Sequence, residues 1–177
     1  NIDKENIRHL IESTEVKAGT LFTSAFALLM SKFTGDEQVL FSTIWHGRSD
    51  KRMARTMGMF VKTLPVHYAF HRGMTLAELF AHGDKIIKGA RKHSVFSYAD
   101  ANASLGIKSN YLFVYQGYLF NNITIGGYPV TMEDLEESAT TEPLSIQIYQ
   151  ERDGGYRAVV EYFSHLYSEA LVAQLIE

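Results

Sequence analysis

The sequence of 177 residues contains no cysteine. This absence excludes disulfide bonds, thiolate metal ligands and cysteine nucleophiles. No apolar run reaches the roughly 18 residues that a membrane-spanning helix needs. The first residues, NIDKENIRHL, lack the basic and apolar segments of a secretory signal. We therefore expect a cytoplasmic protein that has no membrane partner.

Excess charge of one sign is also missing. The chain carries 17 basic and 20 acidic residues, for a formal net charge of −3. This balance disfavours a nucleic-acid partner or an anionic membrane surface, both of which select basic proteins. Hydrophobic residues make up 46% and charged residues 21% of the chain, as in globular domains. A small molecule or another protein is the expected partner.

The common sequence signatures of catalytic and cofactor sites are absent. There is no G-x-S-x-G, G-x-x-x-x-G-K-[ST], G-x-G-x-x-G or H-E-x-x-H. His67 and His71 are four residues apart, but on a predicted strand that spacing separates them by about 13 Å. We therefore expect no metal site and no directly bound cofactor.

The hydrophobic pattern of the first half predicts alternating helices and strands. Residues 3–12 form an amphipathic helix, and Thr20 is the expected N-cap of a buried helix that ends at Gly35. Strands are predicted at 38–45, which should be central, and at 62–70, where Pro65 favours an edge position. A long amphipathic helix should cover residues 75–93.

The second half is predicted to be richer in strands. Two strands are expected at 111–116 and 123–131, and an acidic loop at 132–143. A hairpin then joins alternating residues 144–149 to a strand at 156–163, and Ser168 caps a final helix. The expected fold class is α/β, with helices packed on a mixed sheet in a single unit spanning residues 1–177.

The segment HGRSD places His46 four residues before Asp50, a spacing that some acyltransferases use for a general base. Gly47 most simply permits a tight turn, and Arg48 most simply bonds carbonyls across it. Trp45 and His46 lie at the carboxyl end of the predicted central strand, which in open α/β sheets faces the binding crevice. Two roles therefore stay possible for Trp45 and His46: lining a cleft, or packing locally.

A cluster of basic residues follows this turn. Lys51, Arg52 and Arg55 join Arg48, and Asp50 is the only acidic residue among them. The cluster could contact a phosphate or an acidic helix of a partner, or it could be a solvated loop. The next segment, Met57 to Val61, contains Gly58 and is expected to pack rather than to touch substrate.

Several segments, taken in order, resemble the second half of the condensation domains of non-ribosomal peptide synthetases. They are TLFTSAFALLMSKFTGDEQVLFSTIWHGRS, MGMFVKTLPVHY, KHSVFSYAD, NYLFVYQGY and EPLSIQIYQERDGGYRAVVEYFSHLYS. The segment from Met57 to Pro65 is similar to the glycine-phenylalanine-valine-asparagine-threonine motif of that family, with Lys62 in place of asparagine. The chain lacks the phenylalanine-asparagine-tyrosine-leucine-glycine form of epimerisation domains, which favours condensation.

This resemblance implies a fold of two halves, like chloramphenicol acetyltransferase, with a cleft between them. Thioesters on the phosphopantetheine arms of a donor and an acceptor carrier domain enter this cleft, and the acceptor amine attacks the donor thioester. The implied partners are the N-terminal half, both peptidyl carrier domains and an adjacent adenylation domain. Trp45, His46, Arg48 and Gly58 are the candidate cleft residues, and Lys51, Arg52 and Arg55 the candidate contacts to carrier or phosphopantetheine.

The catalytic motif of the family, HHxxxDG, belongs to its first half and is missing here. No two histidines are adjacent in the sequence, and Trp45 and Lys51 occupy the positions that flank HGRSD. We interpret the spacing of His46 and Asp50 as coincidental, and we expect no catalytic residue in this chain and no activity from it alone. Two alternatives stay open: a complete small acyltransferase that uses His46, and a non-catalytic module that docks a carrier domain.

Overall fold

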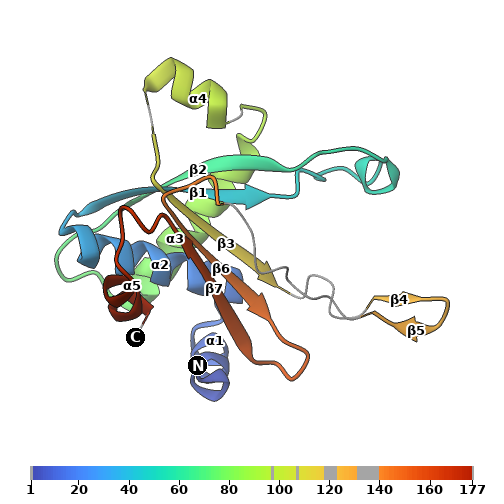
Figure 1. The fold of residues 1–177 in the computed structure, drawn as a ribbon, viewed down its shortest axis with the longest axis horizontal. Helices are drawn as coiled ribbons and strands as arrows, with labels where there is room; N and C mark the ends of the chain where they lie inside the picture. The colour runs from blue at the N-terminus through green and yellow to red at the C-terminus, as the bar shows by residue number, and fades with distance from the viewer. Residues whose placement is uncertain (1, 97, 107, 118–122, 131–139, 177) are drawn as a thin grey trace.

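The computed structural model describes residues 2–96, 98–106, 108–117, 123–130 and 140–176, and Figure 1 shows their arrangement. The helices are α1 (Lys4–Thr14), α2 (Ala18–Thr34), η1 (Met53–Arg55), α3 (Leu76–Lys92), α4 (Tyr98–Leu105) and α5 (Glu169–Ile176). The strands are β1 (Gln38–Trp45), β2 (Lys62–Ala69), β3 (Tyr111–Gly117), β4 (Thr124–Ile125), β5 (Tyr128–Pro129), β6 (Leu144–Gln150) and β7 (Tyr156–Tyr162). None of the described helices is long and apolar enough to cross a membrane.

Five strands form one mixed sheet in the order β2-β1-β3-β6-β7. The three inner strands run parallel to one another, and the two edge strands pair with them in antiparallel fashion. The mixed α/β fold class predicted from the sequence is confirmed. The predicted edge position of β2 is also confirmed, and Pro65 lies opposite Ser42 of β1 in that pairing.

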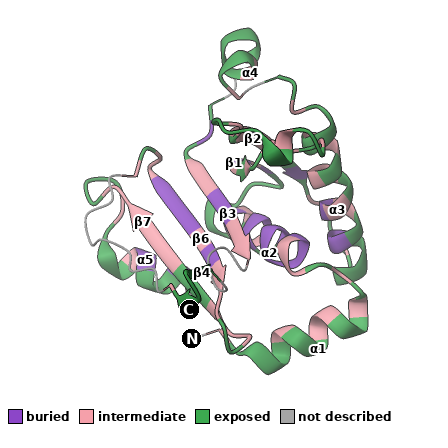
Figure 2. Cartoon of the chain, turned by 90° about the vertical axis from the view of Figure 1, so that its right-hand side faces the viewer, coloured by how far each residue is buried: buried purple, intermediate pink, exposed green. Residues whose placement is uncertain are grey.

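The core forms where one face of the sheet meets the helices. Along each strand, every second side chain points to this face and joins buried residues of α2 in a single hydrophobic cluster. Each of the four inner or edge strands β1, β2, β3 and β6 contributes such residues, for example Phe41, Val66, Phe113 and Ile146. Figure 2 shows this concentration of buried residues in β6 and α2. Helix α2 can bury so much of its surface because apolar residues occupy nearly all of its faces.

The ends of the two long helices follow different local rules. Helix α3 forms within the predicted range of residues 75–93, and Thr75 caps it in a capping box with Glu78. The expected cap at Thr20 is wrong: α2 begins at Ala18, and Thr20 is a buried residue of its first turn. Burial of Thr20 against the neighbouring elements outweighs its preference for the cap position.

Other differences from the sequence predictions lie between β3 and β6 and after α3. The strand expected at 123–131 is instead a small hairpin, β4–β5, because Gly126 and Gly127 adopt positive φ angles and turn the chain. Helix α4 was not predicted, because its short sequence carries little amphipathic pattern. Residues 131–139 of the predicted acidic loop lie outside the described residues.

Two segments project from the body on the same side (Figure 1). The first, which we call the arm, comprises residues 46–61 between β1 and β2 and contains η1. The second is the β4–β5 hairpin, which Arg152 contacts by donating to the Val130 carbonyl at 3.0 Å. Both projections lie at the edge of the sheet where the chain leaves β1 and β3.

Candidate functional site: the carboxyl edge of the sheet

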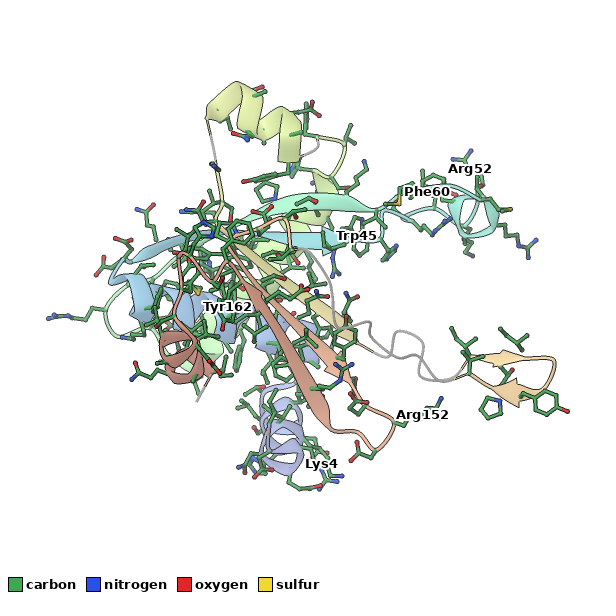
Figure 3. All side chains as sticks on the ribbon, viewed as in Figure 1. Lys4, Trp45, Arg52, Phe60, Arg152 and Tyr162 are labelled. Atoms are coloured by element: carbon green, nitrogen blue, oxygen red, sulfur yellow. The ribbon has the colours of Figure 1, made fainter. Side chains whose placement is uncertain are left out.

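The three parallel strands β1, β3 and β6 end at the same edge of the sheet, at Trp45, Gly117 and Gln150. In open α/β sheets, ligands bind outside the carboxyl ends of such strands. The candidate residues around HGRSD follow β1 directly, so the fold brings them to this edge. Figure 3 shows Trp45 at the base of the arm and Arg52 at its far end.

His46 and Asp50 do not form a catalytic pair in this structure. The backbone N–H of Arg48 donates to Nδ1 of His46 at 3.0 Å, so the neutral ring carries its proton on Nε2 and has no free basic nitrogen. The Asp50 carboxylate accepts hydrogen bonds from the backbone and guanidinium of Arg52, and these bonds lower the Asp50 pKa. Both groups are bound within the local turn, which supports the interpretation that their spacing is coincidental.

Arg48 holds the base of the arm together. Its guanidinium donates to the carbonyls of Met53, Thr56 (2.8 Å) and Gly58 (3.1 Å), and it lies 4.6 Å from the centre of the Phe60 ring. This is the structural role across the turn that the sequence favours for Arg48. Gly47 has a φ of 69°, and a Cβ there would overlap the Phe60 carbonyl oxygen, so only glycine fits.

The basic candidates Lys51, Arg52 and Arg55 are exposed in the outer part of the arm. Arg52 pairs with Asp50 at 2.8 Å on the surface, where its side chain is 90% exposed. Because the arm carries these residues away from the body, their charges face solvent (Figure 3). The arm therefore presents a basic tip, and its contact with a partner stays a prediction.

The expectation that Met57 to Val61 packs is wrong for its two methionines, whereas Phe60 is half-buried beneath the Arg48 guanidinium. The side chains of Met57 and Met59 are 98% and 86% exposed. Gly58, between them, is also exposed, and its carbonyl accepts a hydrogen bond from Arg48. The arm projects away from the core, so these side chains find no described residue to cover them.

A hollow of about 340 Å³ opens at the same edge on the helix side of the sheet. Its wall includes Trp45, Tyr115 and the start of α2 at Lys17, together with Asp84 and Arg91 of α3. The Arg91 guanidinium lies 4.4 Å from the centre of the Trp45 ring. Trp45 thus lines a cavity and also packs locally. His46, whose ring lies 3.8 Å from that of Trp45, and Arg48 and Gly58 are not part of its wall.

The charged groups of the hollow are partly compensated. Asp84 pairs with Lys88 at 2.5 Å on the same helix. Desolvation against the hollow lowers the pKa of Arg91, while the negative charge of Asp84 opposes that shift. The wall therefore combines aromatic and aliphatic surface with charged groups of both signs.

The sequence patterns did not indicate Arg91, Tyr115 or Asp84 as site residues. Their contribution depends on the packing of α3 and β3 against β1, which no local pattern reveals. Knowledge of the strand order would have identified these residues, because the parallel pairing of β1 and β3 places the end of β3 beside the end of β1. Among the described residues, no group of three histidine, aspartate or glutamate side chains could hold a metal ion.

The comparisons with known proteins agree on one family. Residues 2–177 match the profile of the family described as Condensation domain. Surfactin synthase subunit 1 of Bacillus subtilis (strain 168) is 22% identical over an alignment 181 residues long, which covers 98% of this chain and 5% of that protein.

Two solved structures have similar folds at low identity. The first condensation domain of the CDA synthetase has a TM-score of 0.78 at 20% identity, over 98% of this chain and 40% of that one. The four-domain non-ribosomal peptide synthetase holo-AB3403, bound to AMP and glycine, has a TM-score of 0.82 at 15% identity, over 98% of this chain and 15% of that one. The present chain therefore spans less than half of the proteins that it resembles, and it belongs to the condensation-domain family.

Proposed function

We propose that the chain is the acceptor-side, C-terminal half of a condensation domain in a non-ribosomal peptide synthetase. The complete domain would join carrier-bound aminoacyl and peptidyl thioesters by forming a peptide bond. The observation that carries this proposal is the coverage: 98% of this chain aligns with only 40% of the condensation domain of the CDA synthetase. The missing HHxxxDG motif supports it, because that part of the family pattern lies in the other half.

The apolar side chains of the arm and of the β4–β5 hairpin support a partner on the side to which these two projections point. The arm exposes Met57 and Met59, and the hairpin exposes 71% of Ile125 and 78% of Tyr128. Large apolar side chains gathered in this way mark interaction surfaces. We propose that the N-terminal half of the domain covers them, which would place the carboxyl edge of the sheet at the boundary between the halves. The resulting domain would have the two-part fold of chloramphenicol acetyltransferase.

The donor and acceptor carrier domains and an adenylation domain are the further proposed partners. The carrier domains would supply phosphopantetheine, so this chain would bind no cofactor of its own. Lys51, Arg52 and Arg55 at the tip of the arm are exposed cations that suit an acidic carrier surface or the phosphate of phosphopantetheine. Trp45 would line the acceptor side of the cleft, and His46 and Gly58 would lie near it.

In the complete domain, positioning would supply much of the rate. Holding the acceptor amine against the donor thioester turns a bimolecular aminolysis into an effectively unimolecular step. The present chain would contribute one wall of the cleft and no proton-transferring group. The hydrogen bonds that already occupy His46 and Asp50 support this division of labour.

The test is His46→Ala in the longer protein that contains both halves, supplied with loaded donor and acceptor carriers. We expect dipeptide formation to stay within about threefold of wild type, since removal of a true general base costs roughly 10²–10⁴-fold. Trp45→Ala should reduce the rate more than His46→Ala. A loss of about a hundredfold or more in His46→Ala would instead support the small acyltransferase that uses His46.

A non-catalytic docking module is the remaining alternative, and the same protein tests it. It predicts carrier binding without dipeptide formation, together with no effect of His46→Ala or Arg48→Ala on any turnover. Dipeptide formation by the wild-type protein would exclude this alternative.

A further inference from the structure

A hydrogen-bonded row of polar side chains crosses β3, β6 and β7 on the face of the sheet opposite to the core. Phe113 and Ile146 point into the core, so the residues that alternate with them point to the other face. The Nε2 of Gln116 donates to Oε1 of Gln147 at 3.1 Å, and the Nε2 of Gln147 donates to Glu161 at 3.2 Å. We call Gln116, Gln147 and Glu161 the amide row.

The orientation of the central glutamine is fixed by its neighbours. Its carbonyl oxygen accepts from both Gln116 and the hydroxyl of Tyr149, which lies 3.2 Å away. One of its N–H groups is held by Glu161. A carboxamide with its oxygen saturated in this way presents its second N–H in one direction, so Gln147 is a preorganised donor.

The amide row has hydrogen-bonding capacity that it does not use within the described part of the chain. No described residue bonds to the carbonyl oxygen of Gln116 or to the second N–H of either glutamine. Both side chains are half-buried, where an unmade hydrogen bond is costly. A free acceptor beside free donors suits a ligand that contains amide groups, because each amide also offers one acceptor and one donor.

One end of the amide row lies at the edge where a ligand is expected, and the row runs from there across the sheet toward the start of β6. Gln116 immediately precedes the last residue of β3, and Gln147 lies next to it on the parallel neighbour β6. The apolar side chain of Val159 is the cross-strand neighbour of Gln147 and is half-buried. The row therefore offers an apolar contact beside its amide groups, as a chain that carries both amide and methylene groups requires.

We propose that Gln116 and Gln147 are positioning residues that bind the amide groups of the pantetheine arm of the acceptor thioester. This inference rests on the proposed function, because it takes the acceptor to be a carrier-bound thioester. A pantetheine arm carries two amides joined by two methylene groups, and the amides have the donor and acceptor that the row leaves unpaired. The row would hold the pantetheine on this face of the sheet while the aminoacyl group reaches the cleft.

The experiment compares two acceptor substrates in the longer protein that contains both halves. One is an aminoacyl-pantetheine thioester and the other is the same aminoacyl group as an ethanethiol thioester, which has no amide in its thiol part. Gln116→Ala should lower kcat/KM for the pantetheine substrate about tenfold and change that for the ethanethiol substrate less than about twofold. The loss should appear mainly in KM.

Two further variants separate binding from folding. Gln147→Ala should reproduce the substrate-selective loss. If Gln147→Ala does not fold, Gln116→Ala alone still tests the proposal, because Gln116 lies at the end of the row and its loss leaves the rest of the row in place. Ser145→Ala is the matched control: Ser145 lies on the same face, and its hydroxyl has no hydrogen-bond partner among the described groups. It should leave the ratio of the two kcat/KM values unchanged. Equal losses for both substrates in Gln116→Ala would overturn the proposal.

A binding measurement distinguishes failure of this inference from failure of the proposed function. Calorimetric titration with pantetheine should show binding that weakens about tenfold in Gln116→Ala and is unchanged in Ser145→Ala. A wild-type protein that forms no peptide bond but shows this pattern would contradict the proposed function and support the amide row. Pantetheine binding that is the same in wild type and Gln116→Ala would overturn the amide row, whatever the catalytic result.

Discussion

The carbonyl oxygen of Phe60 occupies the position that a side chain at Gly47 would need, so the two ends of the arm meet backbone against backbone. Arg48 then donates to three carbonyls along the arm. The arm is therefore a built element whose base is fixed by glycine and arginine. This fixed base is what allows the basic tip and the apolar side chains to be held out from the body.

Gly47→Ala should displace the arm and destabilise the protein by on the order of 3 kcal/mol or more, because the left-handed φ and the overlap both oppose the new methyl group. Gly35→Ala is the matched control. Gly35 also has a positive φ, 77°, but nothing lies within 4 Å of the position that a Cβ would take there, so its cost should be about 1 kcal/mol. Urea unfolding measures both. Equal losses would show that the Phe60 contact does not matter.

Arg48→Lys should loosen the arm, because an ammonium group cannot reach three carbonyls from one planar fork. We expect a loss of about 1–3 kcal/mol and faster amide hydrogen exchange over residues 48–61. Arg55→Lys, in the exposed tip, should change neither quantity. Unchanged exchange in Arg48→Lys would mean that other contacts hold the arm.

Two glycines of α3 should respond in opposite ways to alanine. A Cβ at Gly83 would overlap Ser24 and the Tyr68 hydroxyl, so Gly83→Ala should separate α3 from the sheet and cost about 2–3 kcal/mol. Nothing lies within 4 Å of a Cβ at Gly89, so Gly89→Ala should stabilise the helix by about 0.5–1 kcal/mol. Thermal unfolding of the two variants checks the prediction, and a stabilised Gly83→Ala would contradict this packing.

Alkaline pH should destabilise the protein partly through Tyr68. Burial raises the pKa of Tyr68 to about 12, although its hydrogen bond with Ser24 opposes the shift. Because the folded pKa exceeds the unfolded value of 10.0, this contribution to stability is complete below pH 10 and is lost as the pH rises through about 12.

The size of this effect follows from the two pKa values. It is on the order of 2–3 kcal/mol across that interval. Tyr68→Phe should remove this part of the pH dependence while keeping the ring in the core, as urea unfolding at pH 9 and above would show. Parallel stability curves for wild type and Tyr68→Phe would exclude the role of Tyr68.

The features that could be predicted from the sequence depend on local pattern. The strand β1, the alternation in β6, the start of α3 next to Thr75 and the turn before β7 are each specified by residues close in the chain, and the structure confirms them. The family resemblance rested on motifs such as Met57 to Pro65, and the match over residues 2–177 confirms it.

The features that the sequence did not predict depend on residues far apart. Met57 to Val61 has the composition of a packed segment, but the arm carries it away from the core of this chain. The stacking of Arg91 on Trp45 and the pairing of Gln116 with Gln147 need the order and register of strands. One sequence carries no direct signal for either.

The decisive experiment supplies this chain alone, and then the protein containing both halves, with loaded donor and acceptor carriers. We predict no dipeptide above the uncatalysed background from the chain alone and rapid dipeptide formation from the longer protein. Dipeptide formation by the isolated chain would contradict the claim that it is one half of a condensation domain without a catalytic residue of its own.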